Sequence, residues 1–348
     1  MKRQKPPGRA AGFNPANRYH SLRAEPDDDR QAAVSGRTTT EIDHARNAIS
    51  YNDSPDIRFD RSINPYRGCE HGCIYCYARP THAWLDLSPG LDFEQRLFRR
   101  PDLPALLRTE LAQANYRPAP IAIGSITDAY QPIERHHRIT RDVLQVLVDT
   151  RHPTLLITKS ALIERDIDLL TELAGNQLLE VAVSLTTLDT TLARRMEPRA
   201  SAPQRRLETI STLAAAGIPV RILLAPLIPV LTEPEIEQLL GAAACCGAVS
   251  ASYVLLRLPA EVSPLFRDWL QRHYPDSLSH VMAHQQAMRA GSDNDSAFHG
   301  RMRGSGAYAD IIHQRFELCR RRHALQSEVP LRCDLFRPPS AHGQLSLF

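Results

Sequence analysis

Three of the seven cysteines in this 348-residue chain lie within a stretch of eight residues. Cys69, Cys73 and Cys76 are separated by three and then by two residues. Thiolates that come from one loop are the ligands that an iron–sulfur cluster needs, and three ligands leave one iron of a four-iron cluster open. The alternative is a structural zinc ion, which usually takes four ligands and would need His71 as the fourth.

Two glycines in the same segment favour a tightly wrapped loop. Gly68 precedes the first cysteine and Gly72 precedes the second, and glycine adopts positive φ angles without strain. The other cysteines are scattered, and an odd total fits a disulfide framework poorly. In a reducing compartment, clustered cysteines indicate metal binding before they indicate disulfides. The scattered cysteines are Cys245, Cys246, Cys319 and Cys333.

The elements that must position this segment alternate between short apolar runs and longer amphipathic stretches. Strands are expected at 119–126, 154–158, 179–185, 220–225 and 253–257, with a first strand just before Cys69. Helices are expected at 103–116, 138–150, 163–174, 202–216, 233–244, 276–290 and 307–323. Repeated strand–helix alternation predicts a parallel sheet with right-handed crossovers, and six units would form an open, partial barrel. Active sites of such sheets lie at the carboxyl ends of the strands.

The spacing Cys-x3-Cys-x2-Cys, with Tyr75 directly before the last cysteine, resembles the signature of the radical S-adenosylmethionine (SAM) superfamily. The resemblance implies an α/β fold: a partial (β/α)6 radical SAM barrel with a mainly helical C-terminal extension. It also implies that the open iron of a 4Fe–4S cluster binds SAM, and that Tyr75 packs near the adenine. An electron from the cluster would then cleave SAM to methionine and a 5′-deoxyadenosyl radical.

Further motifs resemble the branch related to spore photoproduct lyase, which is called DNA repair photolyase-like. The matching stretches lie at 64–82, 127–134, 158–160, 184–189 and 197–199. Several follow expected strands, so their polar side chains would surround the mouth of the barrel and bind SAM. Arg199 would bind the SAM carboxylate or, alternatively, form an ion pair with Glu197. The candidate SAM-binding residues are Tyr75, Ser125, Thr127, Asp128, Lys159, Ser160, Ser184, Thr186 and Arg199.

The candidate hydrogen-atom donor departs from that branch. Spore photoproduct lyases use a cysteine near the end of the second strand, but this chain has no cysteine between Cys76 and Cys245. Ser125 stands at the approximate equivalent position, and its O–H bond is too strong for that role. Splitting of spore photoproduct itself is therefore not expected, and Tyr130 and Tyr77 are the candidate catalytic donors.

The composition divides the chain into four parts. Residues 1–55 are charged and aperiodic, which predicts a flexible tail with a candidate docking segment at 12–15. Residues 56–270 carry the barrel pattern, 271–337 form a helical, basic extension, and 338–348 form a flexible end. Residues 299–337 contain eight Arg and four acidic residues, a local net charge of +4. Such a surface is either a solvated helix face or a contact for DNA phosphates.

The last five residues form a separate motif. Gln344, Leu345, Ser346, Leu347 and Phe348 resemble the short linear motif with which bacterial polymerases and repair proteins bind the replicative sliding clamp. The three apolar side chains would enter a hydrophobic pocket and contribute on the order of 1.5–3 kcal/mol each before ordering costs. The alternative is that this tail packs on its own domain.

The composition argues against a membrane protein. There is no apolar run of about 18 residues and no apolar stretch after the basic start, so neither a membrane span nor a secretory signal is expected, and the expected compartment is the cytoplasm. The resemblance implies a radical SAM enzyme that repairs or processes a damaged base in DNA, with an electron donor such as flavodoxin or ferredoxin. The alternatives are radical modification of RNA or protein, and a zinc-stabilised nucleic-acid-binding module without catalysis.

Overall fold

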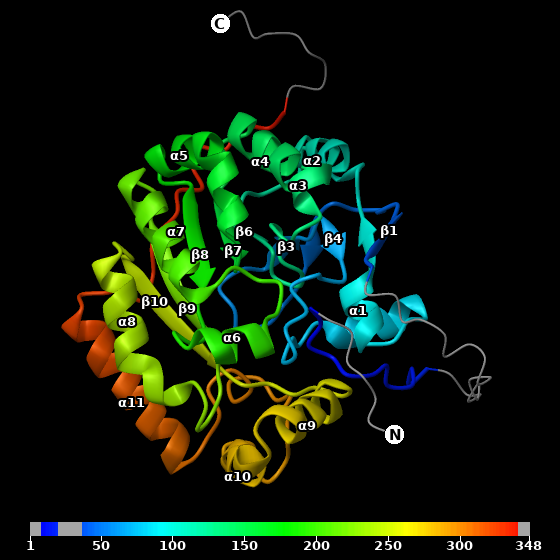
Figure 1. The fold of residues 1–348 in the computed structure, drawn as a ribbon. Coiled ribbons are helices and arrows are strands. Elements are labelled where there is room, and N and C mark those ends of the chain that lie inside the picture. Colours follow the sequence, from blue (N-terminus) through cyan, green and yellow to red (C-terminus); the bar gives the residue numbers. More distant parts are fainter. Residues whose placement is uncertain (1–7, 20–36, 340–348) are drawn as a thin grey trace, which may run out of the picture.

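The computed structural model describes residues 8–19 and 37–339. A seven-stranded sheet forms its centre, in the order β10-β9-β8-β7-β6-β3-β2 (Figure 1). Six of these strands run parallel, as predicted, and β2 is antiparallel to β3. Their bounds are Ser50–Tyr51 (β2), Arg61–Ile63 (β3), Ile121–Ile123 (β6), Thr154–Thr158 (β7), Leu179–Ser184 (β8), Val220–Leu227 (β9) and Ser250–Leu255 (β10).

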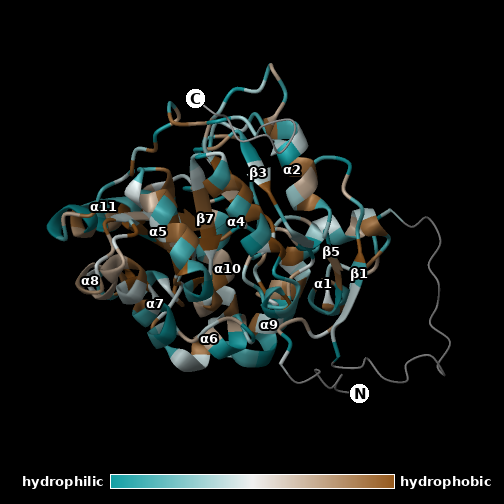
Figure 2. Cartoon of the chain, turned by 90° about the horizontal axis from the view of Figure 1, so that it is seen from above, coloured by the Kyte–Doolittle hydropathy of each residue, from teal (hydrophilic) through white to brown (hydrophobic). Residues whose placement is uncertain are grey.

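Helices cover the outer face of this sheet (Figure 1). Leu144, Leu170 and Leu213 lie on three of these helices and are fully buried in the main core. Figure 2 shows the hydrophobic strand β7 behind helices whose outer surfaces are largely hydrophilic. The helices of this layer and the segments joined to them are Leu103–Leu111 (α2), Glu134–His137 (α3), Ile139–Asp149 (α4), Ala161–Asp166 (η3), Ile167–Gly175 (α5), Thr190–Met196 (α6), Pro203–Ala215 (α7), Glu233–Glu235 (η4) and Ile236–Cys245 (α8).

The cysteine segment follows β3, and a small second sheet lies beside it. In this sheet β5 pairs with β1 in parallel and with β4 in antiparallel orientation. The cysteine segment itself leads into a 3-10 helix and a short α-helix before the chain returns to the barrel. The bounds are Thr39–Ile42 (β1), Tyr66–Arg67 (β4), Arg79–Leu85 (η2), Leu91–Gln95 (α1) and Arg96–Arg99 (β5).

Three helices and an extended segment follow the last barrel strand. These are Val262–His273 (α9), Leu278–Ala287 (α10) and Ala307–Arg322 (α11), with the 3-10 turn Pro275–Ser277 (η5) between the first two. α9 begins before residue 270, so the predicted domain boundary cuts through this helix. Residues 326–337 are not helical: the amides of Arg332 and Arg337 donate to the carbonyls of Gln177 and Thr150, on the barrel. In the part of the chain that the structure describes, no helix has the length and apolar content to cross a membrane.

The N-terminal part differs most from the prediction. Residues 8–19 and 37–55 are not a free tail, because Ala10, Ala11, Ala48 and Ile49 are all buried. The amides of Ala48 and Ile49 donate to the two carboxylate oxygens of Glu110 on α2. The candidate docking segment at 12–15 lies within the first docked stretch. The local composition did not reveal that this part is docked, because its backbone amides bind carboxylates that are distant in the sequence.

Candidate functional site

The cysteine segment forms a tight loop at the carboxyl end of β3. Gly68 and Gly72 have φ angles of +71° and +64°, so the predicted positive-φ turns are confirmed. A Cβ atom at Gly68 would lie 2.6 Å from Cδ2 of Leu97 and 3.0 Å from the backbone oxygen of Phe93, which together with the positive φ disfavours any larger residue there. Cys69 and Cys73 are buried, and the third cysteine of the loop is partly buried. None of the three forms a disulfide.

The three thiols of this loop are costly to ionise unless a metal binds them. Burial raises the pKa of Cys69, Cys73 and Cys76, and for Cys69 the charges of Asp128 and of the other two cysteines raise it further. Three thiolates in one buried loop therefore need compensating positive charge, which metal binding supplies. An iron–sulfur cluster binds each thiolate through a separate iron, so the three sulfurs need not meet at one point. The side chains present fit such a cluster.

The zinc alternative would need His71 as a fourth ligand. Within residues 8–19 and 37–339, no three or more His, Cys, Asp or Glu side chains are arranged to hold a single metal ion. His71, the fourth ligand that zinc would need, is buried and turns Nδ1 toward Asp128, 3.3 Å from Oδ2. The histidine of the loop therefore faces a carboxylate.

Asp128 joins the cysteine loop to the ends of two strands. Its carboxylate accepts hydrogen bonds from the Thr158 hydroxyl at 2.8 Å and from the amides of Lys159 and Tyr130 at 2.7 and 2.8 Å. Burial alone would raise the pKa of Asp128, but His71 and the hydrogen bonds from the Lys159 amide and the Thr158 hydroxyl together lower it to about 2. Asp128 is therefore ionised at neutral pH, and both of its oxygens already have protein partners.

Lys159 brings a positive charge close to the cysteines. Its Nζ donates to Oγ of Ser184 at 2.9 Å, which links the ends of β7 and β8. Burial dominates the pKa of Cys73 and Cys76, yet the charge of Lys159 lowers both, as expected for a cation near the loop. Two of the predicted SAM-binding side chains thus meet beside the cysteines.

The buried carboxylate of Glu197 accepts hydrogen bonds from two further predicted SAM-binding residues and from an arginine. It accepts hydrogen bonds from the Thr186 hydroxyl at 3.1 Å, from the Tyr75 hydroxyl and from the Arg206 guanidinium. Arg206 also donates to the backbone oxygen of Ser184 at 2.9 Å. The aromatic residue of the cysteine signature is therefore fixed to the end of β8.

Tyr77 spans the mouth of the barrel. Its hydroxyl donates to the backbone oxygen of Ser125, just after β6, and the Arg257 guanidinium lies over its ring, 5.4 Å from the centroid. Arg257 follows β10, which is at the opposite end of the row of parallel strands from β3. Tyr77 is 46% exposed, so a substrate at the mouth can reach it.

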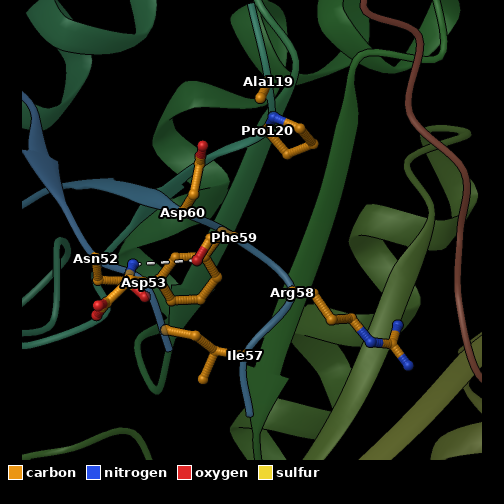
Figure 3. A pocket seen from close by; sticks show the side chains of 8 residues that line it. All are labelled: Asn52, Asp53, Ile57, Arg58, Phe59, Asp60, Ala119 and Pro120. Carbon is orange, nitrogen blue, oxygen red and sulfur yellow. Dashed lines mark hydrogen bonds between the residues drawn. The ribbon is translucent and has the colours of Figure 1, made fainter. Parts of the chain in front are cut away.

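Two surface hollows lie away from this site. One of about 590 Å³ is on the outer face of α11. Another of about 400 Å³ opens at the amino ends of β3 and β6 (Figure 3). The cysteine loop lies at the carboxyl end of β3, which is the opposite end of the strand. Active sites of parallel barrels lie at the carboxyl ends, so the chemistry is assigned to the mouth. The second hollow is lined by Asn52, Asp53, Ile57, Arg58, Phe59, Asp60, Ala119 and Pro120.

Comparison with protein-family models identifies the Radical SAM superfamily over residues 63–243, which is more than half of the chain. This protein belongs to the radical SAM superfamily. Membership implies an enzyme of the radical SAM class, with an iron–sulfur cluster and SAM as cofactors. The matched range runs from the end of β3 into α8 and includes the cysteine loop.

Relatives of this radical SAM protein occur in bacteria and archaea. An uncharacterized protein of Mycobacterium tuberculosis is 36% identical over 225 residues, 64% of this chain and 66% of that protein. The match thus covers just under two thirds of that relative's length. An uncharacterized protein of Methanocaldococcus jannaschii is 28% identical over 62% of this chain and 76% of its own.

Among solved structures, spore photoproduct lyase has the same fold. The complex of that enzyme with dinucleoside spore photoproduct has a TM-score of 0.56 and 15% identity, over 82% of this chain and 78% of the other. A mutant of that enzyme with bound AdoMet and dinucleoside spore photoproduct has a TM-score of 0.55 and 16% identity, with the same coverage. The predicted fold class, a partial radical SAM barrel like that of the spore photoproduct lyase-related branch, is confirmed.

The structure corrects the prediction for Tyr130. This residue is fully buried in the main core, and its hydroxyl donates to Asp166 at 3.0 Å, beneath the Arg165 guanidinium. Asp166 ends η3, which belongs to the outer layer of the radical SAM barrel and not to its mouth. A buried tyrosine with this orientation does not meet a substrate, which leaves Tyr77 as the accessible candidate.

Other predicted residues have structural partners of their own. The Ser160 hydroxyl accepts the Leu162 amide at 3.2 Å and caps η3, and the Thr127 hydroxyl donates to the Tyr66 carbonyl at 2.9 Å. Arg199 forms an ion pair with Glu70 at 3.1 Å, so the predicted alternative partner Glu197 is wrong. SAM binding by Thr127 and Arg199 stays a prediction, whereas the Ser160 hydroxyl is directed to its own helix cap.

Several residues of the site were missed by sequence analysis. Arg206 and Arg257 are arginines without a recognisable motif, and their importance follows from partners that are distant in sequence. Arg79 and Glu94 form a fully buried ion pair beside the cysteine loop. Arg79 follows the last cysteine by three residues and lies within the matching stretch 64–82, but the sequence assigned no role to it.

Proposed function

We propose that this protein holds a 4Fe–4S cluster on Cys69, Cys73 and Cys76, cleaves SAM reductively, and acts on a nucleotide of DNA. The observation that carries the first part is the buried loop of three cysteines, free of disulfides, at the carboxyl ends of the parallel strands. When bound, the cluster would supply the electron that cleaves SAM to methionine and a 5′-deoxyadenosyl radical.

The residues around the loop would bind and orient SAM. The Lys159 ammonium suits the SAM carboxylate, because a charge-assisted hydrogen bond is stronger than a neutral one. The Ser184 hydroxyl positions that ammonium, which it contacts at 2.9 Å. Tyr75, held by Glu197, would offer its ring to the adenine.

Two features support a nucleotide as the substrate. Spore photoproduct lyase, which shares this fold, was solved with dinucleoside spore photoproduct. At the mouth of the present barrel, Tyr77 offers an aromatic face on which a base can stack, and Arg257 offers a guanidinium that can bind a phosphate. Among the described residues, Arg257 has no ion pair, its Nε has no hydrogen-bond partner, and its Nη1 contacts Sδ of Met302 at 3.8 Å.

Tyr77 would also serve as the hydrogen-atom donor. It lies next to Cys76 in the chain and is partly exposed, whereas Tyr130 is fully buried. The hydroxyl of Tyr77 donates to the carbonyl of Ser125, the residue that stands at the approximate position of the donor cysteine of the related branch.

The test uses anaerobically reconstituted protein, SAM, dithionite and oligonucleotides with or without ultraviolet damage. We expect damaged DNA to stimulate 5′-deoxyadenosine formation and to yield an altered nucleoside by mass spectrometry. Tyr77→Phe should lower the ratio of altered nucleoside to 5′-deoxyadenosine at least tenfold, because the donor hydroxyl is lost. Tyr51→Phe, at another exposed tyrosine, is the control. Absence of both DNA binding and DNA-dependent stimulation would overturn the DNA assignment.

A further inference from the structure

The N-terminal stretch of residues 8–17 crosses the face of the molecule beside α1, as the blue segment in Figure 1 shows. Asn14 exchanges hydrogen bonds with Asp92, donating at 2.9 Å to Oδ1 and accepting the Asp92 amide at 3.1 Å. The Asn17 amide donates to the Ala83 carbonyl at 2.9 Å, and the Ser88 hydroxyl donates to the Pro15 carbonyl at 2.7 Å. We call residues 8–17 the strap.

The strap contacts the cysteine loop through one carboxylate. The amides of Ala10 and Ala11 donate to Oε2 and Oε1 of Glu94 at 3.1 and 2.9 Å. Glu94 in turn lies against the loop at Gly72, where an added Cβ atom would be 2.8 Å from Oε2. The missing side chain of Gly72 is thus what lets this carboxylate approach the cysteines.

Arg79 completes the connection from the strap to the loop. Its guanidinium forms an ion pair with Glu94 at 2.6 Å, and neither side chain is exposed to solvent. The same guanidinium donates to the carbonyls of Gly72 and Cys73, both at 3.0 Å. A buried guanidinium that lost its carboxylate would be strongly unfavourable, so the strap, Glu94 and Arg79 hold one another in place.

A second contact joins the strap to the other side of the loop. Arg9 is fully buried and donates to the Thr38 hydroxyl at 2.8 Å. That hydroxyl donates to Glu70, which lies between the first two cysteines and also pairs with Arg199. Both halves of the Cys69–Cys73 interval are therefore connected to the N-terminal segment.

We propose that the strap is a positioning element whose docking, through Glu94 and Arg79, sets the backbone of the cysteine loop, so that strap docking and cluster binding stabilise each other. The proposal rests on the assignment of an iron–sulfur cluster to this loop. Coupling of two binding events is reciprocal, so cluster loading must also tighten the strap. Glu94 and Arg79 act through the loop and are positioning residues, not catalytic ones.

The test compares Glu94→Gln with a matched control, Glu110→Gln. Glu110, on α2, likewise accepts hydrogen bonds from two adjacent backbone amides, which are those of Ala48 and Ile49. It therefore makes the same kind of contact away from the strap. In metal-free protein, alkylation of Cys69 and Cys73 should be at least tenfold faster in Glu94→Gln than in wild type, and unchanged in Glu110→Gln. This measurement needs no cluster, so its failure is distinguishable from failure of the proposed function.

Two further measurements address the loaded protein. In Glu94→Gln the reduced cluster should show an altered electron paramagnetic resonance spectrum and faster iron release to a chelator. In wild type, hydrogen exchange of the Ala10 and Ala11 amides should slow at least tenfold on cluster loading. If Glu94→Gln does not fold, a variant that lacks residues 2–17 but keeps Glu94 provides the same comparison. The proposal would be overturned if Glu94→Gln were alkylated no faster than the control. It would also be overturned if hydrogen exchange of the Ala10 and Ala11 amides were the same with and without the cluster.

Discussion

At the residue scale, neighbouring positions have different roles. Lys159 and Ser160 follow β7 directly and were both predicted to bind SAM. The Lys159 ammonium points to Ser184 beside the cysteines, whereas the Ser160 hydroxyl caps η3. A residue that directly follows a barrel strand is therefore expected near the mouth of the barrel, but the direction of its side chain decides its role.

The first prediction separates these two residues. Lys159→Met should weaken SAM binding roughly 10–100-fold, because a hydrogen bond to a charged group contributes about 1.5–3 kcal/mol. Iron content should stay at the wild-type level. Ser160→Ala is the matched control: it should cost about 1 kcal/mol of stability through the lost cap and leave SAM affinity unchanged. Isothermal titration under anaerobic conditions measures both affinities, and equal affinity of Lys159→Met and wild type would contradict the assignment.

The spacing of the cysteines and glycines predicted the cysteine loop well, whereas the side chains that form ion pairs around it could not be predicted. The three cysteines and two glycines carry their information locally, and the structure confirms the turns that Gly68 and Gly72 form. The choice of Arg206 as the partner of Glu197 depends on packing between α7 and the end of β8. No local pattern contains that information.

At the element scale, periodicity located most of the barrel. β7 has the predicted bounds, and β8 differs from them by one residue. The last strand begins three residues earlier than predicted, because Ser250 and Ala251 are small residues that do not contribute an apolar run. Helix α6 was missed: it has only seven residues, too few for a clear period, and begins at an Asp189 cap. Short elements held by caps and tertiary contacts escape a pattern search.

The contact between α4 and β7 predicts acid sensitivity. His152 is fully buried, with Nδ1 against the Pro153 carbonyl at 3.0 Å and Nε2 against the Tyr116 hydroxyl at 2.7 Å. Burial lowers the pKa of His152 to about 4. In the unfolded chain His152 becomes protonated below about pH 6.5, whereas in the folded protein it becomes protonated only below about pH 4. Stability should therefore fall as the pH drops through this window, by up to about 3 kcal/mol for this residue.

Urea unfolding between pH 7.5 and 4.5 measures this effect. His152→Gln should be less stable at pH 7.5 but should lose less stability on acidification than wild type. His136→Gln, at an exposed histidine, should retain the wild-type pH dependence. Parallel pH profiles for wild type and His152→Gln would show that His152 does not titrate as argued.

At the scale of the whole molecule, the ends of the described chain are integrated with the barrel. Residues 8–19 dock near the cysteine loop, and residues 326–339 run along the other end of the sheet. The predicted basic surface is also partly neutralised: Arg301 pairs with Asp56, Arg315 with Glu237, and Arg320 with Glu317. Contact with DNA phosphates through this region would depend on the exposed arginines that form no ion pair with a described residue, which are Arg303, Arg321, Arg322 and Arg337.

The C-terminal tail carries the prediction at this scale, and it falls on residues outside those described. A peptide with Gln344, Leu345, Ser346, Leu347 and Phe348 should bind the replicative sliding clamp with micromolar affinity, because a linear motif carries its contacts within itself. Leu347→Ala with Phe348→Ala should abolish binding by removing apolar anchors. Truncation after Gly343 should leave SAM cleavage intact. The anisotropy of a labelled peptide titrated with clamp measures the affinity. A signal that does not saturate up to roughly millimolar clamp, which corresponds to a binding free energy of about 4 kcal/mol, would contradict clamp binding.

The central claim is that the cysteine loop holds a cluster that cleaves SAM, and one experiment tests it directly. Wild type, Cys69→Ala, Cys73→Ala and Cys76→Ala are reconstituted anaerobically beside the control Cys245→Ala, which changes an exposed cysteine outside the loop. Iron content and 5′-deoxyadenosine are measured after dithionite reduction with SAM. Wild type and the control should bind iron and form 5′-deoxyadenosine, and each loop variant should lose both. A colourless wild-type protein with one zinc ion, or wild-type 5′-deoxyadenosine formation by all three loop variants, would contradict the account.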